Sequence, residues 1–384
     1  MSTDVTPFTI AIPDSELEDL KQRIGNTRWP NEEPCEGWAQ GLPLAYAREL
    51  ADYWLNDYDW RRFESRAAQW PQFTTNIDGV DIHFIHLRSN HPDALPLIIT
   101  HGWPGSFVEF HKVVDALANP SDHGGDAADA FHLVIPCLPG YGFSGKPATT
   151  GTSIEVIGRM WGKLMARLGY DRYVAQGGDW GAVVTQSMGQ TETEHCAGIH
   201  VNMPLVMPDP DTMGDLTEAE QASIDSMSRY TEEGSGYSKQ QSTYPQTLGY
   251  GLADSAVGQM AWIIEKFYNW TDCERNGSRH PENVLNKDEL LDNVMVYWLN
   301  NAGASSARLY WESFNSANLD PIDMPVGCSI FPNEIFRCSK RWAEKRFSNL
   351  IHWNELDAGG HFAAMEQPEL FIEEVRTCFR TLRG

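Results

Sequence analysis

Asp179 stands between two glycines in the pattern Gly177-x-Asp179-x-Gly181, directly after the apolar segment 173–176. Between a strand and a helix, this pattern predicts a sharp turn that lifts the central side chain clear of a sheet. The turn forces a positive φ on the central residue and leaves room only for small residues two positions away. A carboxylate held there can attack a saturated carbon and form a covalent ester. We therefore predict that Asp179 is a nucleophile rather than a helix-capping residue.

His361 follows the apolar segment 350–356 and two glycines, so it is a candidate general base. Such a base needs a carboxylate to orient its imidazole. Glu334 follows the preceding apolar segment, 326–331, and is our prediction for that acid. Asp357 is the alternative, although its closeness to His361 in sequence places both in one turn. Nucleophile, acid and histidine then occur in the chain order of the α/β-hydrolases.

The segment His101-Gly102-Trp103-Pro104 follows another apolar run and is a candidate source of hydrogen-bond donors for a negatively charged oxygen. The backbone N–H groups of Trp103 and of Trp180, the residue after the nucleophile, are expected to form this oxyanion hole. Pro104 would restrict the loop. His101 is interpreted as a structural hydrogen-bonding residue and not as a base.

Five short segments must position these groups, and all five are predicted to be strands. They are apolar along their whole length, which is typical of a parallel sheet covered by helices on both faces. Since ligands bind at the carboxyl ends of such strands, the candidate residues would meet at one edge. The fold class is therefore α/β, of the α/β-hydrolase type, with a mostly parallel central sheet. The predicted strands are 95–100, 131–136, 173–176, 326–331 and 350–356, and the flanking helices are 154–168, 182–188 and 371–382.

Two stretches interrupt or precede this alternation. Residues 206–318 are rich in proline, acidic and aromatic residues and are expected to form an inserted helical lid, with helices at 261–268 and 290–299 and one that begins with a Thr217/Glu220 capping box. Residues 1–90 form an N-terminal meander, in which Ser15 and Glu18 have the spacing of a capping box for a helix that ends near 28–30. A second helix is expected at 44–54. The core is then divided into 91–205 and 319–384.

The composition narrows the function. The net charge of −24 disfavours nucleic acids and anionic membrane surfaces as partners. The seven cysteines are scattered and odd in number, which favours free thiols in a reducing compartment over disulfides or a zinc site. The first 20 residues lack the features of a secretory signal, and no apolar run is as long as a membrane span. We expect a cytoplasmic protein.

With these sites in place, the chain resembles the microsomal-type epoxide hydrolases, including bacterial and fungal relatives with an N-terminal meander. Members of this family have two lid tyrosines that bind the epoxide oxygen, and by their flanking residues Tyr237 and Tyr310 match that pair. The resemblance implies that the meander wraps the core and the lid. It also implies that the acid is Asp or Glu, which Glu334 satisfies. The segments that carry the resemblance are 8–30, 102–106, 177–181 and 360–364.

The resemblance implies hydrolysis of an epoxide to a vicinal diol through an ester on Asp179, with water activated by His361 and Glu334. No metal or organic cofactor is needed for this route, and the expected partner is a small-molecule epoxide substrate of either small or bulky size. A haloalkane dehalogenase with the same nucleophile is the alternative; an esterase, or a scaffold that only binds a ligand, fits less well. The substrate role stays open between detoxification or catabolism and natural-product biosynthesis. Analogy alone points to a homodimer.

Overall fold

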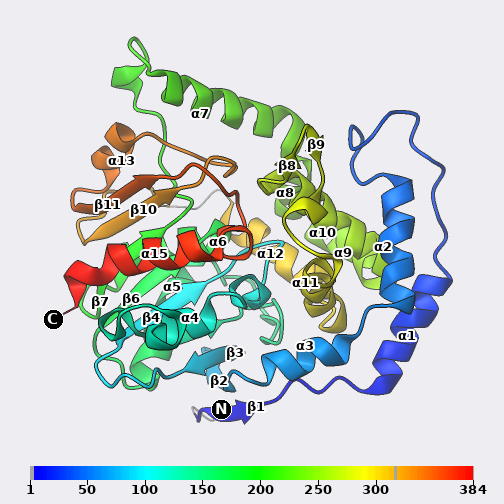
Figure 1. Cartoon of the computed structure of the whole chain (residues 1–384), viewed down its shortest axis with the longest axis horizontal. Helices are drawn as coiled ribbons and strands as arrows, with labels where there is room; N and C mark the ends of the chain where they lie inside the picture. Colours follow the sequence, from blue (N-terminus) through cyan, green and yellow to red (C-terminus); the bar gives the residue numbers. More distant parts are fainter. Residues whose placement is uncertain (1–3, 315–317, 384) are drawn as a thin grey trace.

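The computed structural model describes residues 4–314 and 318–383, and Figure 1 shows their arrangement. A nine-stranded sheet forms the centre of the described chain, in the order β1-β2-β3-β5-β4-β6-β7-β10-β11. From β5 to β11 all neighbours are parallel, whereas β1, β2 and β3 join at one edge as antiparallel strands. The mostly parallel sheet was predicted correctly. The strands are β1 (Thr6–Phe8), β2 (Gln72–Ile77), β3 (Val80–Leu87), β4 (Leu95–Thr100), β5 (Phe131–Pro136), β6 (Tyr173–Gly177), β7 (Cys196–Val201), β10 (Val326–Ile330) and β11 (Leu350–Glu355).

Helices flank this sheet. One group, α4 and α15, packs together and contacts β5, β7 and β11, and a second group, α5 and α6, contacts β2, β4, β6 and β7. The core strands are buried along nearly their whole length, which explains why they read as continuous apolar runs. The helices around the sheet are α4 (Val114–Ala118), α5 (Ile154–Arg167), α6 (Asp179–Thr191), α13 (Lys340–Arg346), α14 (Ala363–Glu366) and α15 (Pro368–Phe379).

The lid is helical, as expected, and lies beside the sheet in Figure 1. The capping box of α7 is present, since Thr217 accepts a bond from the Glu220 backbone and Glu220 accepts one from the Thr217 backbone. Residues 315–317, just before the predicted end of the lid at 318, lie outside the described residues. The lid helices are α7 (Glu218–Arg229), α8 (Gly236–Thr243), α9 (Pro245–Asp254), α10 (Ala256–Trp270), α11 (Lys287–Leu299) and α12 (Gly303–Ser313), with a short hairpin of β8 (Glu274–Arg275) and β9 (Ser278–Arg279).

The N-terminal helices run along the lid. They are α1 (Asp14–Gly25), α2 (Leu44–Asn56) and α3 (Trp60–Ala67); α1 and α2 contact α10, and α2 and α3 contact α11 (Figure 1). The predicted Ser15/Glu18 capping box is wrong. The N-cap of α1 is Pro13, which has no side chain to bond the first turn, and Ser15 already lies inside the helix. Proline sets the φ that suits a helix start, and Asp14 and Glu16 complement the helix dipole there.

The hairpin of β2 and β3 was not predicted. Ile77 pairs with Val80, so the turn consists of Asp78 and Gly79 alone, and both have positive φ. Asp-Gly between two alternating segments is a strong hairpin signal, and it was present in the sequence. The stretch 72–87, assigned above to the N-terminal meander, therefore supplies two strands of the central sheet. Within the described residues, no helix is both long enough and apolar enough to span a membrane.

Candidate active site

Asp179 lies at the turn between β6 and α6, with a positive φ of 51°. The two flanking glycines are required by close backbone approaches. A Cβ on Gly177 would lie 2.1 Å from the Gly181 carbonyl oxygen, and one on Gly181 would lie 1.9 Å from the Thr100 carbonyl oxygen. The local sequence therefore permits a strained conformation that presents the Asp179 carboxylate at the carboxyl ends of the strands.

His361 and Glu334 come from the loops after β11 and β10. An isolated parallel bridge pairs Asn333 with Gly360, and each of these directly precedes one of the two functional residues. The imidazole Nδ1 of His361 lies 2.5 Å from Oε1 of Glu334, and its Nε2 lies 3.3 Å from Oδ2 of Asp179. The three side chains are buried or nearly so. The backbone bridge thus sets the spacing of the acid and the base.

The other candidate acid lies elsewhere. Asp357 is exposed in the structure, and Glu334 is the carboxylate in contact with the imidazole. Glu334 Oε1 also accepts the N–H of Ile335, which restricts its carboxyl group. An orienting acid must be fixed and shielded from water, and the geometry therefore favours Glu334 for this role.

The charge of His361 depends on its two carboxylate neighbours. Burial alone would lower the pKa of the imidazole, but the negative charge of Glu334 and contact with Asp179 outweigh it and hold the pKa well above its usual value. The two neighbouring carboxyl groups therefore favour the protonated form of the imidazole. This arrangement keeps Asp179 paired with a positive charge until a substrate arrives.

One donor of the predicted oxyanion hole points at the nucleophile. The backbone N–H of Trp103 donates to Asp179 Oδ1 at 2.8 Å. Trp180, the second predicted donor, is the second residue of α6 and lies in its first turn, where backbone N–H groups have no partner within the helix. Oδ1 therefore already occupies the position in which a charged oxygen would be stabilised, and Oδ2 is left facing His361.

His101 has both ring nitrogens in use. Nδ1 lies 3.0 Å from the Gly102 carbonyl oxygen, and Nε2 accepts the Leu138 N–H at 3.3 Å. Burial lowers the pKa of this imidazole to about 4. A neutral histidine with both nitrogens occupied fits the structural role expected for it.

The two predicted lid tyrosines lie together over residues 101–106, the oxyanion loop that carries the Trp103 N–H. The ring of Tyr237, on α8, stacks on Trp103 with centroids 4.9 Å apart. The ring of Tyr310, on α12, stands nearly perpendicular to that of Tyr237, with centroids 5.8 Å apart. Burial raises the pKa of both hydroxyls well above the usual value, so both are protonated at neutral pH. Two other lid tyrosines, Tyr244 and Tyr250, are 70% and 71% exposed and point into solvent.

Residues that the sequence analysis did not single out complete the site. The hydroxyl of Tyr230 lies 2.9 Å from that of Tyr237, and the ring of Trp270 packs edge-on against His361 at 5.0 Å. Burial and the charge of Asp179 raise the pKa of Glu109 to about 8, against the opposing effect of His361. Glu109 carries no sequence marker, because its importance comes from burial near the triad.

The oxyanion loop is held from the lid side by α11. Asn293 donates through Nδ2 to the Pro104 carbonyl oxygen at 2.7 Å and accepts the Ser106 hydroxyl at 2.8 Å. Tyr297, one turn later, donates to the Gly105 carbonyl oxygen at 2.7 Å. These buried bonds determine where the loop that carries the Trp103 N–H can lie.

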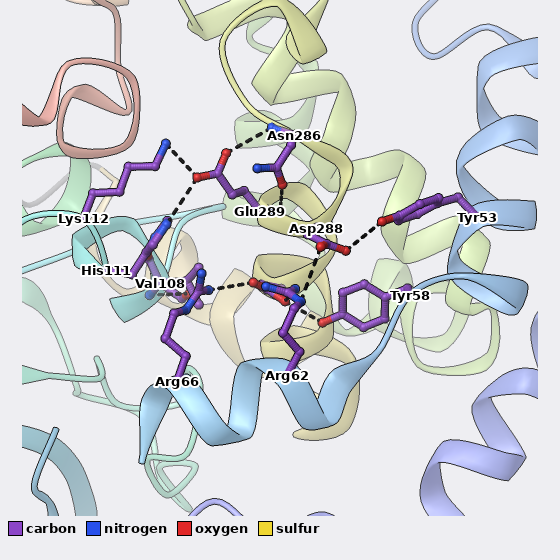
Figure 2. Close-up of polar contacts among 12 residues, drawn as sticks. Tyr53, Tyr58, Arg62, Arg66, Val108, His111, Lys112, Asn286, Asp288 and Glu289 are labelled. Carbon is purple, nitrogen blue, oxygen red and sulfur yellow. Dashed lines mark hydrogen bonds and ion pairs between the residues drawn. The ribbon is translucent and has the colours of Figure 1, made fainter. Parts of the chain in front are cut away.

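Helix α11 is in turn fixed by the N-terminal meander (Figure 2). Asp292, whose side chain is fully buried, accepts bonds from Tyr58, Arg62 and Arg66, each at 2.7 Å. On a neighbouring side of the helix, the carboxylate of Glu289 contacts two basic side chains that follow η1 (Phe107–Phe110), and Figure 2 shows both clusters. The meander therefore contributes to the site indirectly, through a lid helix.

Comparison with known proteins agrees with this geometry. Residues 5–110 match the family described as "Epoxide hydrolase N terminus", and residues 96–246 match "alpha/beta hydrolase fold". A putative epoxide hydrolase of Stigmatella aurantiaca is 52% identical over 381 residues, which cover 99% of this chain and 86% of that protein. The chain belongs to the epoxide hydrolase family. Epoxide hydrolase 1 of Sus scrofa is 34% identical, over 97% of this chain and 88% of that protein.

Solved structures of epoxide hydrolases have the same fold. The Aspergillus niger epoxide hydrolase superposes with a TM-score of 0.88 at 32% identity and covers 98% of this chain and 96% of its own. The juvenile hormone epoxide hydrolase of the silkworm Bombyx mori gives 0.89 at 30% identity, with 100% and 96% covered. The predicted fold and the predicted epoxide hydrolase activity are thus confirmed, and the dehalogenase alternative is not favoured.

Proposed function

We propose that the protein hydrolyses an epoxide to a vicinal diol through a covalent ester on Asp179. The observation that carries this proposal is that the two oxygens of that carboxylate have different partners. Oδ1 accepts the Trp103 N–H, whereas Oδ2 faces the imidazole of His361. One oxygen is therefore arranged to become the ester carbonyl, and the other to form the new bond.

In the first step, Oδ2 of Asp179 attacks an epoxide carbon, and the bond between that carbon and the epoxide oxygen breaks. The departing oxygen needs a proton, and the buried hydroxyls of Tyr237 and Tyr310 can supply it. Their high pKa keeps them protonated until the ring opens. The product of this step is a hydroxyalkyl ester and a tyrosinate.

In the second step, His361 takes a proton from water, and the resulting hydroxide attacks the carboxyl carbon of the ester. The negative oxygen that forms at Oδ1 is stabilised by the N–H groups of Trp103 and Trp180. The bond between that carbon and Oδ2 breaks, and the leaving oxygen takes the proton from His361. The new carboxylic acid loses its proton, which restores the tyrosine hydroxyl.

The first step prepares His361 for the second. Once Asp179 is esterified its negative charge is gone, and one of the two influences that raise the pKa of His361 disappears with it. The imidazolium can then release its proton to solvent and act as a base for water, and it takes up a proton from solvent again once the Asp179 carboxylate is restored. The same residue thus serves as counter-ion before alkylation and as base afterwards.

A single turnover in heavy-oxygen water tests the covalent route. With enzyme in excess, the first diol should contain no heavy oxygen, because its new oxygen comes from Asp179, and Asp179 itself should become labelled. Asp179→Ala should abolish turnover, while the matched control Asp171→Asn, at an exposed position before β6, should retain it. Labelled diol on the first turnover would show that water attacks the epoxide directly.

The substrate and the cellular setting remain predictions. A panel that runs from styrene oxide to bulkier aryl epoxides would separate a role in detoxification or catabolism from one in natural-product biosynthesis. All seven cysteines are unpaired, which supports a reducing compartment such as the cytoplasm. Cell fractionation and analytical ultracentrifugation would test the predicted location and homodimer.

A further inference from the structure

A buried ammonium group lies among aromatic rings beside the proposed proton donor. Lys266, on α10, has a side chain that is only 8% exposed. Its Nζ lies 4.6 Å from the ring centroid of Tyr237, 5.9 Å from that of Trp262 and 6.0 Å from that of Trp270. The nearest of the three rings is the one proposed to protonate the substrate.

Burial of an ammonium group is unfavourable unless it is compensated. Burial lowers the pKa of Lys266, and the neighbouring carboxylate of Glu265 opposes that change. Glu265 forms an ion pair with Lys266 and also accepts the side-chain amide of Asn269. Glu265 and the faces of the three rings together favour the charged form of the lysine. A structural reason for placing a lysine here is weak, because an apolar side chain would fill the same space at lower cost.

We propose that Lys266 is a positioning residue that stabilises the negative charge on Tyr237 while the epoxide ring opens. The inference rests on the proposed role of Tyr237 as proton donor. When the proton moves from the Tyr237 hydroxyl to the epoxide oxygen, the phenol becomes a phenolate. A positive charge already held over its ring stabilises that product without any rearrangement.

Lys266 neither gains nor loses a proton in this step. The proton on the new substrate hydroxyl comes from Tyr237, and Tyr237 recovers a proton when the ester is hydrolysed. The effect of Lys266 should therefore be confined to formation of the ester. Hydrolysis of the ester, which depends on His361, should not sense it.

The test is a comparison of Lys266→Met with the wild type in single-turnover kinetics that resolve the two steps. Ester formation should slow roughly ten- to a hundredfold, the size expected when a positive charge beside the ring that becomes a phenolate is removed at an effective dielectric constant of about 20. The rate of ester hydrolysis should stay unchanged. Lys239→Met, at an exposed position on α8 two residues after Tyr237, is the matched control and should leave both rates unchanged.

A double-mutant cycle separates this role from simple packing. In a Tyr237→Phe background, Lys266→Met should have no further effect on ester formation, whereas in a Tyr310→Phe background its effect should persist. If Lys266→Met does not fold, Lys266→Gln serves in the same cycle. Equal losses in the presence and absence of the Tyr237 hydroxyl, or an equal slowing of ester hydrolysis, would overturn the proposal. Failure of the wild type to form any ester would instead contradict the proposed function.

Discussion

The chemistry of the site depends on which partner each polar atom of the triad faces. His361 has a carboxylate on each side, Glu334 at Nδ1 and Asp179 at Nε2, and in the proposed mechanism only Asp179 loses its charge, when it is alkylated. Removal of Glu334 should therefore have a different effect from removal of Asp179.

Glu334→Gln should slow ester hydrolysis by about 10²–10⁴-fold and leave ester formation less affected, because the imidazole loses its orienting charge. The sign of the pH effect follows from the pKa. Glu334 helps to raise the pKa of His361, so the variant should move the acidic limb of ester hydrolysis to lower pH. Intact-mass spectrometry should show the ester accumulating. Asp357→Asn, the exposed alternative acid, should not accumulate it, and accumulation there would reassign the acid.

The turn between β6 and α6, which we call the elbow, also leads to a prediction about stability. Gly181→Ala places a methyl group 1.9 Å from the Thr100 carbonyl oxygen. Both the new carbon and that oxygen are attached directly to backbone, so neither can move away easily. We expect a loss of about 3 kcal/mol or more in the free energy of unfolding, measured by urea denaturation. Gly25→Ala is the control, because nothing lies within 4 Å of its added carbon and its φ is not positive. Similar stabilities of the two variants would show that the elbow can relax.

Helix α11 lies between the oxyanion loop and the N-terminal meander and contacts both of them. One side holds the oxyanion loop through Asn293 and Tyr297, and the other is held by the N-terminal meander through Asp292. The N-terminal meander thus acts on the site through one lid helix.

Asp292→Asn should lower the free energy of unfolding by about 1–3 kcal/mol, because Arg62 and Arg66 lose a buried partner but keep partial access to water. Asp254→Asn is the control: its side chain is 91% exposed in an ion pair with Arg23, and the expected change is near zero. Chemical denaturation of the two variants beside the wild type makes the comparison. Equal changes would mean that the cluster in Figure 2 contributes no more than a surface pair.

The elements that sequence reasoning predicted are those whose signals are local. The buried parallel strands, the capping box at Thr217 and the Gly-x-Asp-x-Gly turn are each readable within ten residues. The start of α1 was misread because a proline N-cap leaves no polar side chain to recognise. Glu109 and Lys266 were missed because the fold alone brings each of them close to site residues that are distant in sequence.

At the scale of the whole molecule, acid should destabilise the protein through its paired carboxylates. Burial would raise the pKa of Glu289, but bonds from His111 and Lys112 outweigh it and lower the pKa to about 2. A depressed pKa in the folded state means that the stabilisation is complete above the unfolded value near 4.3 and is lost as the pH falls toward 2. Its size is roughly 3 kcal/mol.

Glu289→Gln should therefore flatten the decline in stability between about pH 5 and pH 2, as measured by thermal unfolding across that range. Glu344→Gln, at an exposed position on α13, is the control and should leave the slope unchanged. A steep acid slope that survives in Glu289→Gln would assign it to other carboxylates, of which Glu374, bonded to His352, has its pKa lowered to about 2 as well.

The lid and the catalytic base share a backbone bond. The N–H of His361 donates to the carbonyl oxygen of Trp270, the last residue of α10, at 2.9 Å. A lid that swung away as a rigid body would pull the imidazole out of register with Asp179. We therefore expect epoxides to enter, and diols to leave, through a passage beside a lid that stays seated on the core at this bond. The width of that passage, and not the travel of a hinge, would decide which substrates the protein accepts.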